Sequence, residues 1–298
     1  MATIITGDMK DLDGFSVNRI LPNRDKKMVG PFIFLDHIGP ADFAPGQGVN
    51  VRPHPHIGLS TLTYLFSGSM LHRDSLGNVQ EIFPGEVNWM TAGRGIVHSE
   101  RETMEVRDRQ HTLDGLQFWV ALPAEKAETE PSFEHFRKTE LPHYYLERTI
   151  MRLIAGEAYG MTAPARTHWP MFFLDVISDH GEVIPPPDRQ QECAVYIRQG
   201  TLDIGGERFG DGDFVLLESD EEIQVCDYSR FVILGGRPFT EKPYIRWNFV
   251  AWSRERIRQA EQDWQQQRFP HIPGDQREFT PLPGTRPGTQ PETVPQPQ

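Results

Sequence analysis

The sequence predicts an all-β protein built from two similar barrels, and three features of the chain support this fold class. The 298 residues include 25 prolines and 26 glycines scattered along the chain. Such frequent turn residues suit many short strands better than a helical bundle. Apolar residues recur at every second position in segments such as 62–66, the period expected of a strand. A short motif also recurs in each half of the chain.

We expect the first barrel between about residues 15 and 122. Turn residues at 67–69, 74–78 and 83–86 separate its short apolar runs. Segment 116–122 is rich in aromatic and apolar residues, which is typical of a buried strand.

The connection between the two domains is expected within segment 123–143, which is charged over 124–131 and lacks a strand pattern. We divide the chain there into domains of residues 1–130 and 131–272. Strand-like runs resume after the connection, at 150–155, 171–178, 193–198, 213–217 and 231–234.

The recurring motif relates the two halves directly. Residues 63–69 resemble residues 195–201, with Tyr64 aligned to Tyr196, and a glycine-containing turn follows each copy. Two copies of one small β-barrel are the simplest interpretation of this repeat.

One helix and a tail are expected at the end of the chain. Ser253 can cap the helix, and apolar residues follow at helical spacing as far as Trp264. Residues 273–298 are rich in Pro, Gly, Thr and Gln, and this composition predicts a disordered tail.

Charge and composition exclude several classes of function. The formal net charge of −12 disfavours direct nucleic-acid binding, because phosphate repels an acidic protein at long range. No run of about 18 apolar residues occurs, so no membrane span is expected. Only two cysteines are present, which favours reduced thiols and a cytoplasmic location over a disulfide-stapled secreted scaffold.

Two short motifs carry side chains that bind metals. His54 and His56 flank one proline, and on an extended strand both imidazoles would lie on one face, roughly 6–7 Å apart. His98 and Glu100 repeat this spacing on a second expected strand. If the strands are neighbours, three imidazoles and one carboxylate form a site for a borderline divalent metal such as iron, nickel, copper, zinc or manganese.

Simpler interpretations stay open for these and other residues. Histidine pairs at this spacing also arise by chance on protein surfaces. We expect His37 and His72 to be structural, making backbone hydrogen bonds in turns. Trp89 and Met90 fit plain core packing at least as well as a cavity wall, and Phe43 is a weaker candidate for covering the metal site.

The motifs resemble those of a known superfamily. Residues 48–68 are similar to the first motif of cupin barrels, and residues 85–98 to the second. Cupins usually carry Glu where this chain has Thr61, whereas its carboxylate follows the third histidine as Glu100. This relocation is typical of the pirin family. The segments that most resemble pirins are 34–40, 54–56, 72–78 and 89–100.

The resemblance implies two jelly-roll cupin barrels packed face to face, with one Fe(2+) in the N-terminal barrel. Its ligands would be His54, His56, His98 and Glu100, although these ligands would also accept another divalent transition metal. No metal is expected in the second barrel, because the aligned positions carry no histidine: Pro186, Asp188, Val225 and Asp227.

The resemblance also implies two functions of different classes. The first is a flavonol dioxygenase of the quercetin 2,3-dioxygenase type, with a flavonol-like small molecule and dioxygen as partners. Glu100 would then also be the catalytic base for the 3-hydroxyl proton, which requires a weakly bound carboxylate. The alternative is an iron- or redox-sensing regulator that binds a protein partner, either a transcription factor or a metabolic enzyme.

Overall fold

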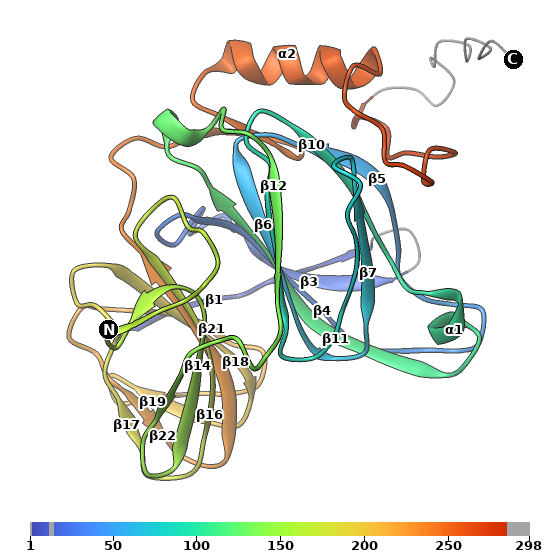
Figure 1. The fold of residues 1–298 in the computed structure, drawn as a ribbon. Helices are drawn as coiled ribbons and strands as arrows, with labels where there is room; N and C mark the ends of the chain where they lie inside the picture. Colours follow the sequence, from blue (N-terminus) through green and yellow to red (C-terminus); the bar gives the residue numbers. More distant parts are fainter. Residues whose placement is uncertain (1, 12–14, 285–298) are drawn as a thin grey trace, which may run out of the picture.

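The computed structural model describes residues 2–11 and 15–284. It confirms the all-β prediction: two barrels lie side by side, and one longer helix follows them near the C-terminus (Figure 1). No helix among the described residues is both long and apolar enough to span a bilayer.

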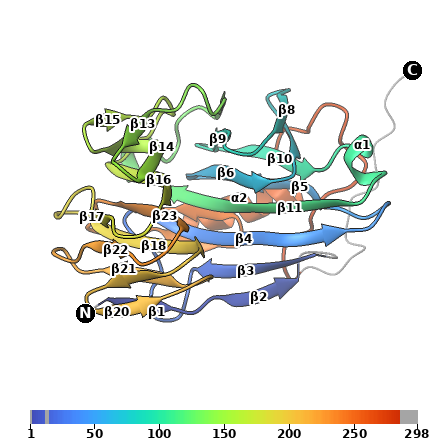
Figure 2. The ribbon, with the colours of Figure 1, turned by 90° about the horizontal axis from the view of Figure 1, so that it is seen from below.

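The first barrel consists of two antiparallel sheets. The larger has the order β12-β9-β6-β11-β4-β3-β2, and the smaller has the order β5-β10-β7-β8. Figure 2 shows β2, β3, β4 and β11 following one another across the larger sheet. The strands are β2 (Asp8–Asp11), β3 (Ser16–Leu21), β4 (Phe32–Phe43), β5 (Asn50–His56), β6 (Leu59–Ser67), β7 (Met70–Asp74), β8 (Val79–Ile82), β9 (Val87–Thr91), β10 (Ile96–Arg101), β11 (His111–Ala121) and β12 (Ser132–Phe136).

The second barrel repeats this design. Its larger sheet has the order β1-β21-β18-β23-β16-β14-β13, with β15 paired to β14, and its smaller sheet has the order β17-β22-β19-β20. The strands are β1 (Thr3–Ile5), β13 (His143–Tyr145), β14 (Thr149–Ala158), β15 (Met161–Thr162), β16 (Met171–Ser178), β17 (Val183–Ile184), β18 (Glu192–Gln199), β19 (Leu202–Ile204), β20 (Glu207–Phe209), β21 (Phe214–Leu217), β22 (Ile223–Val225) and β23 (Ser229–Gly236).

Strand pairing crosses the expected domain boundary in both directions. β1 comes from the start of the chain, yet it pairs with β21 of the second barrel. β12 lies just beyond residue 130, yet it pairs with β9 of the first barrel. The division at residue 130 stays a prediction, and the exchanged strands tie the barrels together.

The main helix begins as expected. In α2 (Arg254–Gln265), the Ser253 hydroxyl accepts a hydrogen bond from the Arg256 amide at 3.2 Å, which satisfies one of the free amides of the first turn. A short hairpin, β24 (Tyr244–Arg246) with β25 (Phe249–Ala251), precedes it. The sequence did not predict the one-turn helix α1 (Met104–Arg107) or the 3-10 turn Ala124–Lys126.

Residues 273–284 are ordered, so the expectation of a disordered tail from residue 273 is wrong for this segment. Asp275 binds the Arg101 guanidinium through both carboxylate oxygens at 3.0 Å, and the Thr280 amide donates to the Pro53 carbonyl at 2.8 Å. Leu282 is buried. Composition predicted disorder here, but these contacts with the first barrel order the segment. Residues 285–298 lie outside the described part of the chain.

The largest apolar cluster joins the two barrels. It combines Tyr64, Trp89 and Phe118 of the first barrel with Phe173 and Phe214 of the second. Trp89 thus packs in the core, as the simpler interpretation predicted, and Met90 packs in a neighbouring apolar cluster.

Candidate metal centre

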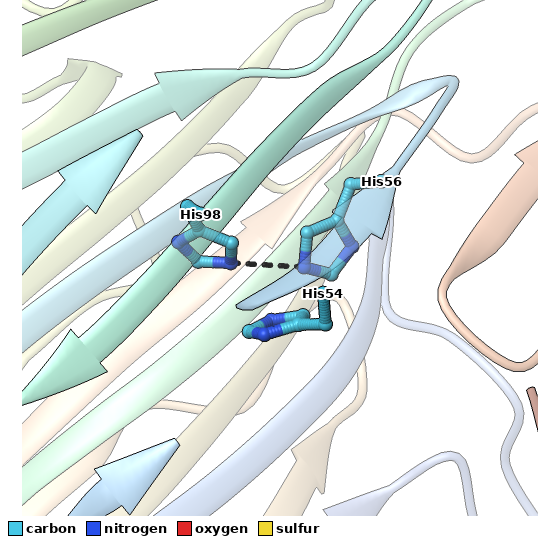
Figure 3. A group of neighbouring side chains, drawn as sticks. All are labelled: His54, His56 and His98. Carbon is cyan, nitrogen blue, oxygen red and sulfur yellow. Dashed lines mark hydrogen bonds between the residues drawn. The ribbon is translucent and has the colours of Figure 1, made fainter. Parts of the chain in front are cut away.

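The structure brings the three predicted histidines together inside the first barrel. His54 and His56 lie on β5, and His98 lies directly opposite His54 on the antiparallel neighbour β10. One ligand nitrogen from each imidazole lies within 4.8 Å of the other two. Figure 3 shows the three rings converging on one point from the two strands. All three side chains are buried, which excludes the simpler interpretation of a chance histidine pair on the protein surface.

Backbone carbonyls orient two of the rings. His54 Nδ1 lies 2.9 Å from the Arg52 carbonyl, and His56 Nδ1 lies 3.2 Å from the Asn248 carbonyl. Because a carbonyl only accepts, each Nδ1 must carry the proton, which leaves the Nε2 lone pair free for a metal. His56 Nε2 faces His98 Nε2 at 3.0 Å. The donor set therefore fits a divalent metal.

Burial also keeps these imidazoles uncharged. It lowers the pKa of His54 to about 4 and holds the pKa values of His56 and His98 well below the usual range. Neutral imidazole is the form that binds metals, so the ligands are ready at neutral pH without first losing a proton.

Glu100 reaches the same cavity but does not join the histidine cluster. Its Oε1 accepts a hydrogen bond from the Thr63 hydroxyl at 3.2 Å, and its oxygens are not part of the group of ligand atoms within 4.8 Å. The register of β10 against β5 shifts between His98 and Glu100, which moves the carboxylate out of line with the rings. Burial raises the pKa of Glu100.

His37 and His72, which we expected to make backbone hydrogen bonds in turns, contact carboxylates instead. His37 Nε2 lies 2.8 Å from Asp114, and His72 Nε2 lies 3.1 Å from Asp74. Both rings lie on strands: Asp114 reaches His37 from the neighbouring strand β11, whereas Asp74 lies two residues after His72 on the same face of β7. Phe43 stacks on His111 and does not line the cavity, so the idea that it covers the metal site is wrong.

A cavity of about 480 Å³ opens from the histidine cluster, a size typical of small-molecule sites. Trp119 packs edge-on to His56, and Phe34 stacks on Trp119 with the ring centroids 4.0 Å apart. Trp247 and Thr280, from the region after the second barrel, complete the wall.

Sequence reasoning missed the polar residues of this cavity. Arg19, Asp36 and Gln117 all line it, and the Asn248 carbonyl orients His56. A signal existed for two of them, because Asp36 and Gln117 interrupt otherwise apolar strands. Nothing in the local sequence marks Asn248, whose role depends on a contact across 192 residues.

Two family models match the chain. The model described as "Pirin" covers residues 14–120, and the model described as "Pirin C-terminal cupin domain" covers residues 173–270. Together they support both the cupin type of the barrels and the resemblance drawn from the motifs.

Individual relatives extend over nearly the whole chain. A pirin-like protein of Caulobacter vibrioides is 44% identical, covering 92% of this chain and 96% of its own. Pirin of Rattus norvegicus is 29% identical, covering 87% of this chain and 89% of its own. The crystal structure of a quercetin 2,3-dioxygenase from Acinetobacter baumannii superposes with a TM-score of 0.87 at 32% identity, covering 99% of this chain and 97% of that one.

Proposed function

This chain belongs to the pirin family, and from that premise we propose that it is a mononuclear iron-dependent dioxygenase that opens the central ring of flavonols. One observation carries the proposal: three buried, neutral imidazoles converge in the wall of a largely apolar cavity. The similarity to a quercetin 2,3-dioxygenase over nearly the full length of both chains supports the same reaction class.

His54, His56 and His98 would hold the ion, with Glu100 as a fourth, weakly bound ligand. Iron(II) fits imidazole and carboxylate donors, although these ligands also accept nickel, copper, zinc or manganese. When bound, the metal supplies Lewis acidity and a place for dioxygen beside the substrate.

Glu100 is the residue we assign to proton transfer. Its carboxylate lines the cavity and is not drawn into the histidine cluster, so it can take the proton of the flavonol 3-hydroxyl. The Thr63 hydroxyl contacts Glu100 Oε1 at 3.2 Å and Gln117 Oε1 at 2.9 Å, so it links the carboxylate to the side chain of Gln117. The deprotonated flavonol then reacts with dioxygen, both oxygen atoms enter the products, and ring opening releases carbon monoxide.

The cavity wall supplies the remaining requirements. The stacked rings of Phe34 and Trp119 offer a flat aromatic surface beside His56, which suits a planar substrate. A volume of about 480 Å³ is sufficient for a molecule of flavonol size. The apolar lining also keeps bulk water away from the reacting centre.

The test uses protein loaded with iron(II) under anaerobic conditions, then mixed with quercetin in air. We expect loss of the flavonol absorbance together with oxygen uptake and carbon monoxide release. Metal-free protein and the His98→Ala variant are the controls, and neither should consume quercetin. If iron is confirmed bound and the absorbance does not change, the dioxygenase proposal is wrong.

The regulator alternative stays a prediction, as do a protein partner and a cytoplasmic location. No contact among the described residues favours it over the enzyme. A negative result in the quercetin assay would make it the leading hypothesis.

A further inference from the structure

A row of polar side chains crosses the inner face of the larger sheet in the first barrel. Arg19 on β3 pairs in register with Asp36 on β4, Asp36 pairs with Gln117 on β11, and Gln117 pairs with Thr63 on β6. Residues in register on adjacent strands have side chains on the same face. The row therefore leads from Arg19 to Thr63, which contacts Glu100.

The fold does not need this row. Aligning Tyr196 with Tyr64 places Val195 at the position of Thr63, and the register of the second barrel then gives the rest of its row. The members are Val195, Ile233, Leu174 and Leu153. All four belong to the apolar core of the second barrel. The same positions can thus hold aliphatic residues, so the polar side chains call for a different explanation.

Arg19 has donors to spare. Its Nε and Nη2 each donate to one oxygen of Asp36 at 2.8 Å, and its guanidinium lies 4.6 Å from the centre of the Phe34 ring. Arginine has five N–H donors, and no acceptor among the described residues bonds to Nη1. Since Arg19 and Asp36 both line the cavity, the unused donors are available to a bound molecule.

We propose that the Arg19–Asp36 pair is a second polar anchor of the cavity, which binds a phenolic hydroxyl at the end of a planar aromatic substrate remote from the histidine cluster. The backbones of Arg19 and Thr63 are three strand spacings apart, about 14 Å, so the pair lies at the opposite end of the row from Thr63 and its contact with Glu100. This inference rests on the proposed function and specifies which flavonols the site prefers.

A hydroxyl matches this pair better than a carboxylate does. A hydroxyl both donates and accepts, so it can donate to Asp36 and accept from Arg19 at once. The paired charges cancel, so the anchor does not attract an anion as a lone arginine would. Phe34 lies beneath the guanidinium and stacks on Trp119, so it holds the anchor against the aromatic wall of the cavity.

The test compares two ligands and does not require turnover. Quercetin carries hydroxyls on its outer rings, whereas 3-hydroxyflavone keeps only the 3-hydroxyl. Their dissociation constants are measured with zinc-loaded protein, for the wild type and for Arg19→Leu/Asp36→Leu. The double variant installs the residue type of Leu153 and Leu174 in the second barrel, and replacing a buried ion pair with apolar residues usually preserves stability.

A matched control is available at the interface between the barrels. Arg230 also binds Asp175 through both oxygens and lies 4.5 Å from a phenylalanine ring, but neither residue lines the cavity. Arg230→Leu/Asp175→Leu should therefore leave ligand preference unchanged. Arg19→Lys serves as a milder variant, since it keeps the charge and loses the two-pronged geometry.

We expect the wild type to bind quercetin at least tenfold more tightly than 3-hydroxyflavone, and the Arg19→Leu/Asp36→Leu variant to lose this preference through weaker quercetin binding alone. Arg19→Lys should lose part of it. Equal weakening of both ligands, an unchanged ratio, or no binding of either ligand would each overturn the anchor. Turnover of quercetin by the iron-loaded wild type is measured separately. If the wild type prefers quercetin but does not turn it over, only the dioxygenase proposal is wrong. If it turns quercetin over and the double variant keeps the wild-type ratio of dissociation constants, only the anchor proposal is wrong.

Discussion

The two barrels share one strand plan but differ in what fills them. In the first, β5 and β10 present three imidazoles to a cavity. In the second, the corresponding small sheet carries Ile184, Ile223 and Val225, all fully buried in an apolar core. Packed aliphatic residues stabilise a barrel, whereas a cavity with buried polar groups costs stability. One copy thus contributes packing, which lets the other keep an open site.

The largest effect should come from removing an imidazole of the first barrel. We expect His98→Ala to lose nearly all bound metal and all dioxygenase activity while the apolar core keeps the fold. The matched control is His180→Ala, because His180 is an exposed histidine of the second barrel. Elemental analysis and circular dichroism check both variants. Full metal retention in His98→Ala would show that the proposed ligand set is wrong.

The next largest effect should be on kcat, from replacing the Glu100 carboxylate. Glu100→Gln keeps the shape of the side chain but removes the base, so we expect kcat to fall by about 100-fold or more while most of the metal stays bound. Single-turnover rates and metal content measured on the same sample separate the two roles. If kcat is unchanged with metal bound, proton transfer belongs to another group.

The stability of the protein should depend on pH through a buried cysteine of the second barrel. Burial raises the pKa of the Cys193 thiol from its ordinary value of 9.0 to about 12, so the folded protein keeps a proton that the unfolded chain loses above pH 9. Stability therefore falls as the pH rises from 9 towards 12, by about 2 kcal/mol at pH 10.5 from this group alone. Tyrosines also titrate in this range.

Urea unfolding at pH 8 and pH 10.5 isolates the cysteine contribution. Cys193→Ala loses stability at both pH values through the space it leaves, but its additional loss at pH 10.5 should be smaller than that of the wild type. If the two proteins lose the same stability between these pH values, Cys193 does not contribute to the alkaline sensitivity.

The smallest effect on turnover should come from exchanging one residue between the rows. Thr63→Val installs the residue type of Val195 and removes the hydrogen bond to Glu100, so kcat should fall about tenfold with little change in KM, and Thr63→Ser should restore it. The reciprocal Val195→Thr buries a hydroxyl in an aliphatic core and should cost about 1–3 kcal/mol in unfolding free energy. A change in KM alone would indicate that Thr63 contacts substrate and does not position Glu100.

Much of the fold could be predicted because its signals are local. Alternation marked the strand at 62–66, the repeat around Tyr64 and Tyr196 marked the second barrel, and Ser253 marked the start of α2. Composition failed for residues 273–284, because the contacts of Asp275 and Thr280 with the first barrel are not visible in the local sequence.

The sequence by itself determined which residue types could bind a metal and that two of them, His54 and His56, share one strand face. Only the tertiary structure decided that Glu100 turns towards Thr63, that the Asn248 carbonyl orients His56, and that Arg19 and Asp36 line the same cavity as the imidazoles. The reason is physical: strand periodicity sets the direction of a side chain, whereas register, bulges and packing between distant segments set what it meets.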